Sequence, residues 1–257
     1  MKNCHNFSAG SPTAANRTAR RPGPGASPGP HWTFRQRVGE ERWVAFLRGL
    51  PRMTRPAGWT PMREGDPGVD VFALLGGLVD VWQSGGGRDW EAEQLITIRG
   101  AGDLLGEMAA LELTSRTATV RARTECEVVM ISGERFRSAE FRREWWNDLL
   151  PYVSGRGREG AMILRSGDGA ARVARLVLPL LDHAEGAGQP DGPVCLRITQ
   201  QEVAECLGLG RDTVRRLTSD PPFGGWPKGR GGSLLVTDPE AVRVAAARLG
   251  GWHPQAG

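Results

Sequence analysis

The chain of 257 residues is long enough for two domains that each bury a hydrophobic core of their own. Its four cysteines form no C-x-x-C pair and it has only four histidines, so we predict no zinc, iron–sulfur or histidine-built metal centre and no metalloenzyme. The formal net charge of +4 is compatible with a nucleic-acid partner but does not by itself require one.

The N-terminal residues 1–30 are rich in Ser, Pro, Gly, Ala and Arg and poor in large apolar side chains, which predicts a disordered tail. Met1 to Gly10 lacks the apolar core of a signal peptide, and no apolar run approaches the roughly 20 residues that cross a bilayer. We therefore expect a cytoplasmic protein. A short amphipathic helix is predicted next, around Trp43, Phe46 and Leu47 and closed by Pro51.

From Gly58 to about Ile131, short β-rich runs alternate with glycine-containing turns, at the spacing of an antiparallel roll or barrel. The predicted runs are Val69 to Trp82, Gln94 to Ile98, Thr117 to Ala122 and Glu127 to Ile131. In the third run, Ala118, Val120 and Ala122 alternate with Thr117, Thr119 and Arg121, which predicts that the first set faces inward.

After Phe136 the apolar residues recur at alternating steps of four and three, which is typical of a helix that pairs with another helix. The seam consists of Trp146, Leu150, Val153, Gly157, Gly160 and Leu164. Pro151 marks either a kink or a separate helix start. Residues 141–167 are therefore predicted to be a dimerisation helix and a hinge, the hinge falling at Ser166 to Gly169.

A helix with an apolar face of Val173, Leu176, Val177, Leu180 and Leu181 begins the second domain. It leads to two short helices joined by a turn. Thr199 and Glu202 have the spacing of a capping box, and Gly208 can end the first of these helices in the left-handed conformation.

The second of the two short helices has Val214 and Leu217 facing inward and leaves charged side chains outside: Arg211, Asp212, Arg215 and Arg216. Arginine can pair bidentately with guanine, and a carboxylate accepts from a cytosine amine, so this helix suits a DNA major groove. The alternative interpretation is the solvated face of an ordinary helical hairpin.

Residues Trp226 to Val236 predict a two-stranded wing with a basic glycine turn, and Asp238-Pro239 then starts a closing helix. Lys228 and Arg230 in the turn are candidates for DNA phosphates, which would add affinity and salt dependence without sequence discrimination. An ordinary solvated hairpin tip is the alternative.

Together these residues resemble the Crp/Fnr family, the cyclic-AMP receptor protein and its relatives, over nearly all of the chain beyond about residue 40. The match rests on Ile198-Thr199-x-Gln201-Glu202-Val203-Ala204 and on Arg211-Asp212-Thr213-Val214-x-Arg216. The resemblance implies that Arg211, Asp212 and Arg216 reach base edges, while Thr199 and Gln201 contact the DNA backbone. Thr213 and Arg215 complete the predicted DNA-binding set.

In the front domain, Gly100 to Ala109 and Arg116 to Ala122 are similar to the family's phosphate-binding cassette. The resemblance implies an effector site for cyclic AMP or a related nucleotide, at Gly106, Glu107, Arg116 and Thr117. There Arg116 and Thr117 would hold the phosphate, and Glu107 would accept a hydrogen bond from the ribose. The alternative is a cassette kept for the fold, with Glu107 and Arg116 paired across an empty pocket; the paired hydroxyl side chains of cyclic-AMP sensors are absent near Ala161 and Met162.

The predicted fold is α+β: a cyclic-nucleotide-binding-like β-roll (jelly roll) over 31–140, the long dimerisation helix with its hinge, and a winged helix-turn-helix over 168–257. The predicted function is a sequence-specific DNA-binding transcription regulator, not an enzyme. We expect it to be a homodimer on palindromic double-stranded DNA, with RNA polymerase as a partner. Three alternatives stay open: a ligand-independent regulator with the roll as dimer scaffold, a cupin-like enzyme, and a cyclic-nucleotide regulatory subunit without DNA binding.

Overall fold

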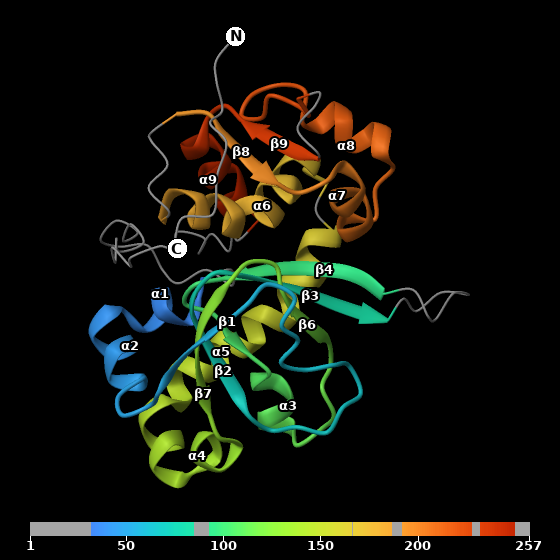
Figure 1. The fold of residues 1–257 in the computed structure, drawn as a ribbon. Helices are drawn as coiled ribbons and strands as arrows, with labels where there is room; N and C mark the ends of the chain where they lie inside the picture. The colour runs from blue at the N-terminus through green and yellow to red at the C-terminus, as the bar shows by residue number, and fades with distance from the viewer. Residues whose placement is uncertain (1–31, 85–92, 166, 187–191, 228–231, 250–257) are drawn as a thin grey trace, which may run out of the picture. The chain divides into compact units, whose positions relative to one another are not determined.

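The computed structural model describes residues 32–84, 93–165, 167–186, 192–227 and 232–249, with side chains omitted for 158–165. The predicted disordered tail and the predicted phosphate contacts Lys228 and Arg230 lie outside the described residues. The chain divides into two compact units, one within Ser27–Ser166 and one over Gly167–Leu249 (Figure 1). Each unit is described by itself below.

The first unit is built on two antiparallel sheets, as the predicted roll requires. One sheet has the order β1 (Arg52–Arg55), β7 (Cys126–Ile131), β2 (Val71–Gly76), β5 (Leu104–Leu105). The other has the order β4 (Glu93–Gly100), β3 (Leu78–Ser84), β6 (Thr119–Ala122). Their inward side chains form a core that includes Leu74, Val79 and Val128, all fully buried.

Two details of the strands differ from the sequence predictions. The run from Val69 to Trp82 is two strands, because the chain turns at Gly77, where φ is +85° and the backbone of Glu125 approaches too closely for a side chain. Thr119, predicted to face outward, is buried. Its hydroxyl accepts a hydrogen bond from the backbone N–H of Glu64 at 3.0 Å, which satisfies the polar group inside the roll.

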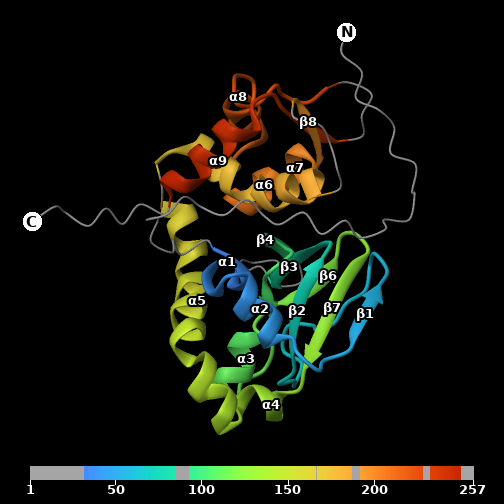
Figure 2. The ribbon, with the colours of Figure 1, turned by 90° about the vertical axis from the view of Figure 1, so that its left-hand side faces the viewer.

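Five helices accompany this roll in the part of the chain that the structure describes: α1 (Phe34–Val38), α2 (Glu40–Phe46), α3 (Glu107–Glu112), α4 (Gly133–Arg137) and α5 (Ala139–Arg165). Helices α1, α2 and α5 cover the four-stranded sheet (Figure 2). Aromatic rings dominate the contact, and Phe34 lies within 5.0 to 6.4 Å of the rings of Phe46, Trp43, Trp145 and Tyr152.

Helix α5 runs unbroken from Ala139 to Arg165. Pro151 lies inside it, so the predicted separate helix start is wrong, and Pro151 has no N–H to donate to the helix. One face of α5, with Phe141, Trp145 and Leu149, is buried in the core of its own unit. A different face carries the predicted seam.

The second unit contains α6 (Gly169–Gly186), β8 (Val194–Arg197), α7 (Gln200–Leu207), α8 (Arg211–Leu217), β9 (Ser233–Val236) and α9 (Pro239–Arg248). The predicted apolar face of α6 is confirmed, since all five of its residues are buried. In the wing, β9 pairs with β8, which precedes the helix-turn-helix, and a single bridge joins Phe223 to Val236. The second strand therefore comes from earlier in the chain than predicted.

No helix in the described part of the chain is long and apolar enough to span a membrane.

Candidate DNA interface and effector cassette

Local sequence signals fix the two short helices of the second unit. The hydroxyl of Thr199 accepts a hydrogen bond from the backbone N–H of Glu202 at 3.1 Å, and the Glu202 carboxylate accepts one from the backbone N–H of Thr199 at 2.6 Å. Gly208 ends α7 with φ +60°, as predicted. Helix α8 begins at Arg211, directly after this turn, and the helix-turn-helix is confirmed.

Helix α8 has one buried face and one charged face. Val214 is fully buried, whereas Arg211, Asp212, Arg215 and Arg216 are exposed and Thr213 is half-buried. The Arg215 guanidinium lies 3.4 Å from the Asp212 carboxylate, and that of Arg216 donates to the Thr213 hydroxyl at 3.4 Å. These contacts are long and solvent-exposed, so the charged groups exchange them readily for other partners.

Thr199 and Gln201 lie at the start of α7. The Thr199 hydroxyl is used by the cap, and the exposed Gln201 amide donates to the Glu205 carboxylate at 2.5 Å. Both side chains remain at or near the surface.

The end of α8 is held by residues that the sequence patterns did not single out. Thr218 is completely buried, and its hydroxyl accepts a hydrogen bond from the indole N–H of Trp226 at 2.9 Å. The backbone N–H of Gly225 donates to the Thr218 carbonyl at 2.7 Å. Periodicity could not reveal this contact, because it joins residues on opposite sides of an irregular loop.

The predicted effector residues come together at the start of α3. Gly106 caps this helix in the left-handed conformation, and Glu107 is its first residue. The Glu107 side chain is buried, and within the described ranges no other residue gives it a hydrogen bond or ion pair. Burial raises the pKa of the Glu107 carboxyl, and the hydrogen bond from its own backbone N–H and the charges of Arg99 and Arg156 oppose this only in part.

Arg116 reaches into the same region but binds carbonyls. Its guanidinium donates to the backbone oxygens of Gly106 at 3.0 Å and of Asp70 at 2.8 Å, and the residue is only 6% exposed. Gly68 and Gly106 leave it room, since a side chain at either position would collide with the guanidinium. No ion pair joins Arg116 to Glu107 in the described chain, so the alternative in which these two residues pair across an empty pocket is wrong. Thr117, the last of the predicted effector residues, is exposed.

A buried polar network, which sequence reasoning missed, ties the cassette to α5. The Asp103 carboxylate forms an ion pair with Arg156 and accepts a hydrogen bond from the Tyr152 hydroxyl at 3.2 Å. The same hydroxyl accepts from the backbone N–H of Leu104 at 3.0 Å. Asp103 and Arg156 are 53 residues apart, and each side chain is 4% exposed.

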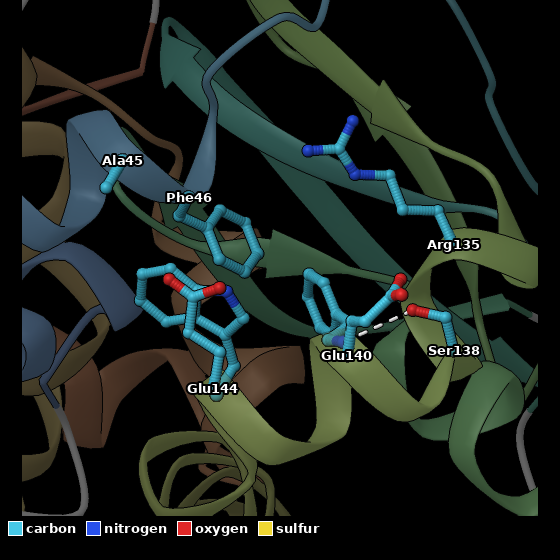
Figure 3. A pocket seen from close by; sticks show the side chains of 8 residues that line it. Ala45, Phe46, Arg135, Ser138, Glu140 and Glu144 are labelled. Carbon is cyan, nitrogen blue, oxygen red and sulfur yellow. Dashed lines mark hydrogen bonds between the residues drawn. The ribbon is translucent and has the colours of Figure 1, made fainter.

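A surface pocket of about 330 Å³ lies elsewhere in this unit, at the junction of α2, α4 and α5 (Figure 3). The rings of Phe46, Phe141 and Trp145 line it, together with the side chains of Glu140 and Glu144. None of the predicted effector residues lines it. Because three of its lining residues belong to the aromatic core, we interpret it as a depression over that core.

The His, Cys, Asp and Glu side chains of the described residues form no group of three or more that could hold a metal ion. The free thiols are separate, and Cys126 and Cys206 are buried.

Comparison with known proteins places this architecture in a family. The profile described as "Cyclic nucleotide-binding domain" matches residues 53–142. The "CRP-like cAMP-activated global transcriptional regulator" of Mycobacterium tuberculosis is 30% identical over 207 residues, which are 77% of this chain and 89% of that protein. The "cAMP-activated global transcriptional regulator CRP" of Haemophilus influenzae is 28% identical over 168 residues, 63% of this chain and 73% of that protein.

Solved structures agree in fold. A CRP/FNR-family transcriptional regulator from Thermus thermophilus has a TM-score of 0.55 at 18% identity, covering 76% of this chain and 98% of its own. FixK2 from Bradyrhizobium japonicum has a TM-score of 0.53 at 16% identity, covering 76% and 96%.

A roll of this kind followed by a winged helix-turn-helix defines a DNA-binding transcription regulator rather than an enzyme. The chain belongs to the Crp/Fnr family of transcription regulators, whose members bind DNA and act as dimers.

Proposed function

We propose that α8 reads the bases of a palindromic DNA site, with the two copies of a homodimer entering successive major grooves about 34 Å apart. The observation that carries this proposal is the division of α8 into a buried side, anchored by Val214, and a side with exposed charged residues. An exposed arginine can release its weak contact with a neighbouring side chain and bind guanine instead.

In this proposal Arg211, Asp212 and Arg216 contact base edges, and Arg215 and Thr213 support them from the same helix. Thr199 and Gln201, at the start of α7, contact the DNA backbone. Lys228 and Arg230, outside the described residues, contact phosphates from the wing. The proposed domain boundaries follow from these roles, with sensing and dimerisation before the hinge near Ser166 and DNA reading after it.

Dimerisation is assigned to α5. Trp146 and Leu150 are 39% and 50% exposed although both are large and apolar, and the seam continues through Val153 to Gly157, where nothing lies within 4 Å of an added Cβ. The rest of the predicted seam, Gly160 and Leu164, falls where side chains are not described. Burying this face against a second α5 would remove its apolar side chains from water.

The cassette is proposed as the effector site. The buried carboxylate of Glu107 makes no ion pair within the described residues, so its burial is costly unless a ligand group binds it, and a ribose hydroxyl can donate to it. Gly106, Arg116 and Thr117 would bind the phosphate. The two named relatives are described as cAMP-activated, so cyclic AMP is the first nucleotide to test. The second candidate is a ligand-independent regulator, which is favoured by the two carbonyls that already engage Arg116.

Selection of genomic DNA fragments by the purified protein, with and without cyclic AMP, tests the proposal. A palindromic motif in both arms supports the ligand-independent regulator, and a motif only with nucleotide supports the effector site. The absence of a motif in both arms would contradict sequence-specific reading. RNA polymerase, the proposed partner, is tested by its co-retention on a promoter fragment that carries the motif.

Substitution of one arginine sharpens this test. We expect Arg216→Ala to weaken binding to the selected site by about 1–3 kcal/mol and to relax the preference at one base pair, because a bidentate contact is lost. Arg248→Ala, in an exposed position on α9, is the matched control and should leave the affinity unchanged. Equal losses for the two variants, measured by fluorescence anisotropy, would contradict the assignment of α8.

A further inference from the structure

The orientation of α8 needs an anchor that its own sequence does not provide. The helix has seven residues, too few for a stable isolated helix. Its N-cap, Gly210, makes no side-chain capping bond. Val214 and the half-buried Leu217, whose side chain lies against Gly169 at the start of α6, pack the apolar side of the helix but make no directional bond.

Directional hydrogen bonds hold the C-terminal end of the helix. At Thr218 the backbone N–H and the hydroxyl both donate to the Val214 carbonyl, at 3.1 Å and 2.9 Å. The same hydroxyl accepts from the Trp226 indole N–H at 2.9 Å, while the Thr218 carbonyl accepts from Gly225. Thr218 is fully buried, so water does not compete for these bonds.

The far side of this contact is itself fixed. Gly225 adopts φ +73°, which a residue with a side chain rarely does, and its carbonyl accepts a hydrogen bond from the N–H of Leu235 in β9 at 2.9 Å. Gly224 donates to the Leu235 carbonyl at 2.8 Å. The indole of Trp226 therefore extends from a segment held against β9, and it connects α8 to that strand.

We propose that Thr218 and Trp226 are positioning residues for DNA recognition, whose hydrogen bond sets the orientation in which α8 presents its charged face to the bases. Neither residue needs to touch DNA in this role. The inference rests on the proposed reading of DNA by α8 and adds the hydrogen bond that sets the orientation of this helix.

Three single variants separate the hydrogen bond from the packing. Thr218→Val keeps the shape and removes the hydroxyl, Trp226→Phe keeps an aromatic ring and removes the N–H, and Thr218→Ser restores the hydroxyl as the matched control. The measured quantity is the ratio of affinities for the selected palindrome and for the same duplex with one half-site base pair replaced. A loss of folded protein lowers both affinities by the same factor and leaves their ratio unchanged. A change in the orientation of α8 lowers the ratio, because it weakens the base contacts of the selected palindrome.

We expect Thr218→Val and Trp226→Phe each to lower this ratio at least about fivefold, the usual effect of one lost hydrogen bond. Thr218→Ser should retain the wild-type ratio, and the double variant Thr218→Val/Trp226→Phe should fall short of the product of the two single effects. Thermal unfolding of each variant establishes that it is folded at the assay temperature; if Thr218→Val is not, Trp226→Phe carries the test.

A wild-type ratio in Trp226→Phe would overturn the inference while leaving the reading of DNA by α8 intact. A wild-type protein that does not distinguish the two duplexes would instead overturn the proposed function, and the inference with it.

Discussion

Glu107 lies in an environment that disfavours the charged form of its side chain. The carboxyl is buried in the first turn of α3, and burial raises its pKa. A group whose pKa is higher in the folded than in the unfolded state favours folding at low pH, and that contribution is lost as the pH rises through the folded-state pKa. Such a cost is typical of residues kept for binding.

We therefore expect Glu107→Gln to stabilise the ligand-free protein at pH 7 by at least about 1 kcal/mol, since the amide carries no charge to bury. The gain should shrink toward pH 4, where the unfolded carboxyl also becomes protonated. Urea unfolding at the two pH values measures the difference. The exposed Glu112, on the same helix, provides the control variant Glu112→Gln, and a gain that does not change with pH would contradict this explanation.

Leu113 has an unfavourable backbone conformation. It ends α3 with φ 57°, the left-handed region that disfavours a residue with a Cβ, and its side chain is 66% exposed. We expect Leu113→Gly to raise the free energy of unfolding by about 1 kcal/mol, because strain is relieved and little burial is lost. Leu113→Ala keeps the Cβ and should bring no gain; a gain in that variant instead would exclude backbone strain as the cause.

At the scale of elements, the Asp103–Arg156 ion pair holds α5 against the first segment of the cassette, which contains Asp103. Both side chains are almost fully buried, and Tyr152 adds hydrogen bonds to Asp103 and to the Leu104 backbone. Removing one member of such a pair leaves a buried charge without a partner, which costs more than the intact pair contributes.

We expect Asp103→Asn to destabilise the protein by about 3–5 kcal/mol, and Asp103→Asn/Arg156→Met to recover part of that loss. Chemical denaturation at a fixed protein concentration measures both, since the stability of a dimer depends on concentration. Glu93, whose exposed carboxylate pairs with Arg121 at 3.2 Å, is the control: Glu93→Ala should cost less than about 1 kcal/mol. Comparable losses at the two ion pairs would contradict the role of burial.

At the scale of the whole molecule, the proposed dimer interface between two copies of α5 can be tested directly. We expect Leu150→Glu to raise the dimer dissociation constant at least about tenfold, because it places two like charges in an apolar seam. Met130, 41% exposed on β7, offers a matched control, and Met130→Glu should leave the dimer unchanged. Sedimentation velocity measures the dissociation. If the dimer of the Leu150 variant persists, α5 is not the interface.

Sequence patterns determined those parts of the protein in which a local interaction suffices. The capping box of α7, the turn at Gly208, the apolar face of α6 and the strands around Val120 and Val128 follow from spacing of two, three or four residues. The same local signals placed Arg211 and Arg216 on one short helix.

Only the tertiary structure decided which distant groups meet. Asp103 forms an ion pair with Arg156, 53 residues away, and Trp226 donates a hydrogen bond to Thr218 across an irregular loop. Strand β9 pairs with a strand that precedes the helix-turn-helix. The structure also decided that Arg116 donates to two carbonyls and that no ion pair forms at the buried Glu107 carboxylate among the described residues. Such contacts depend on how whole elements pack, and packing leaves no period in the sequence from which they could be predicted.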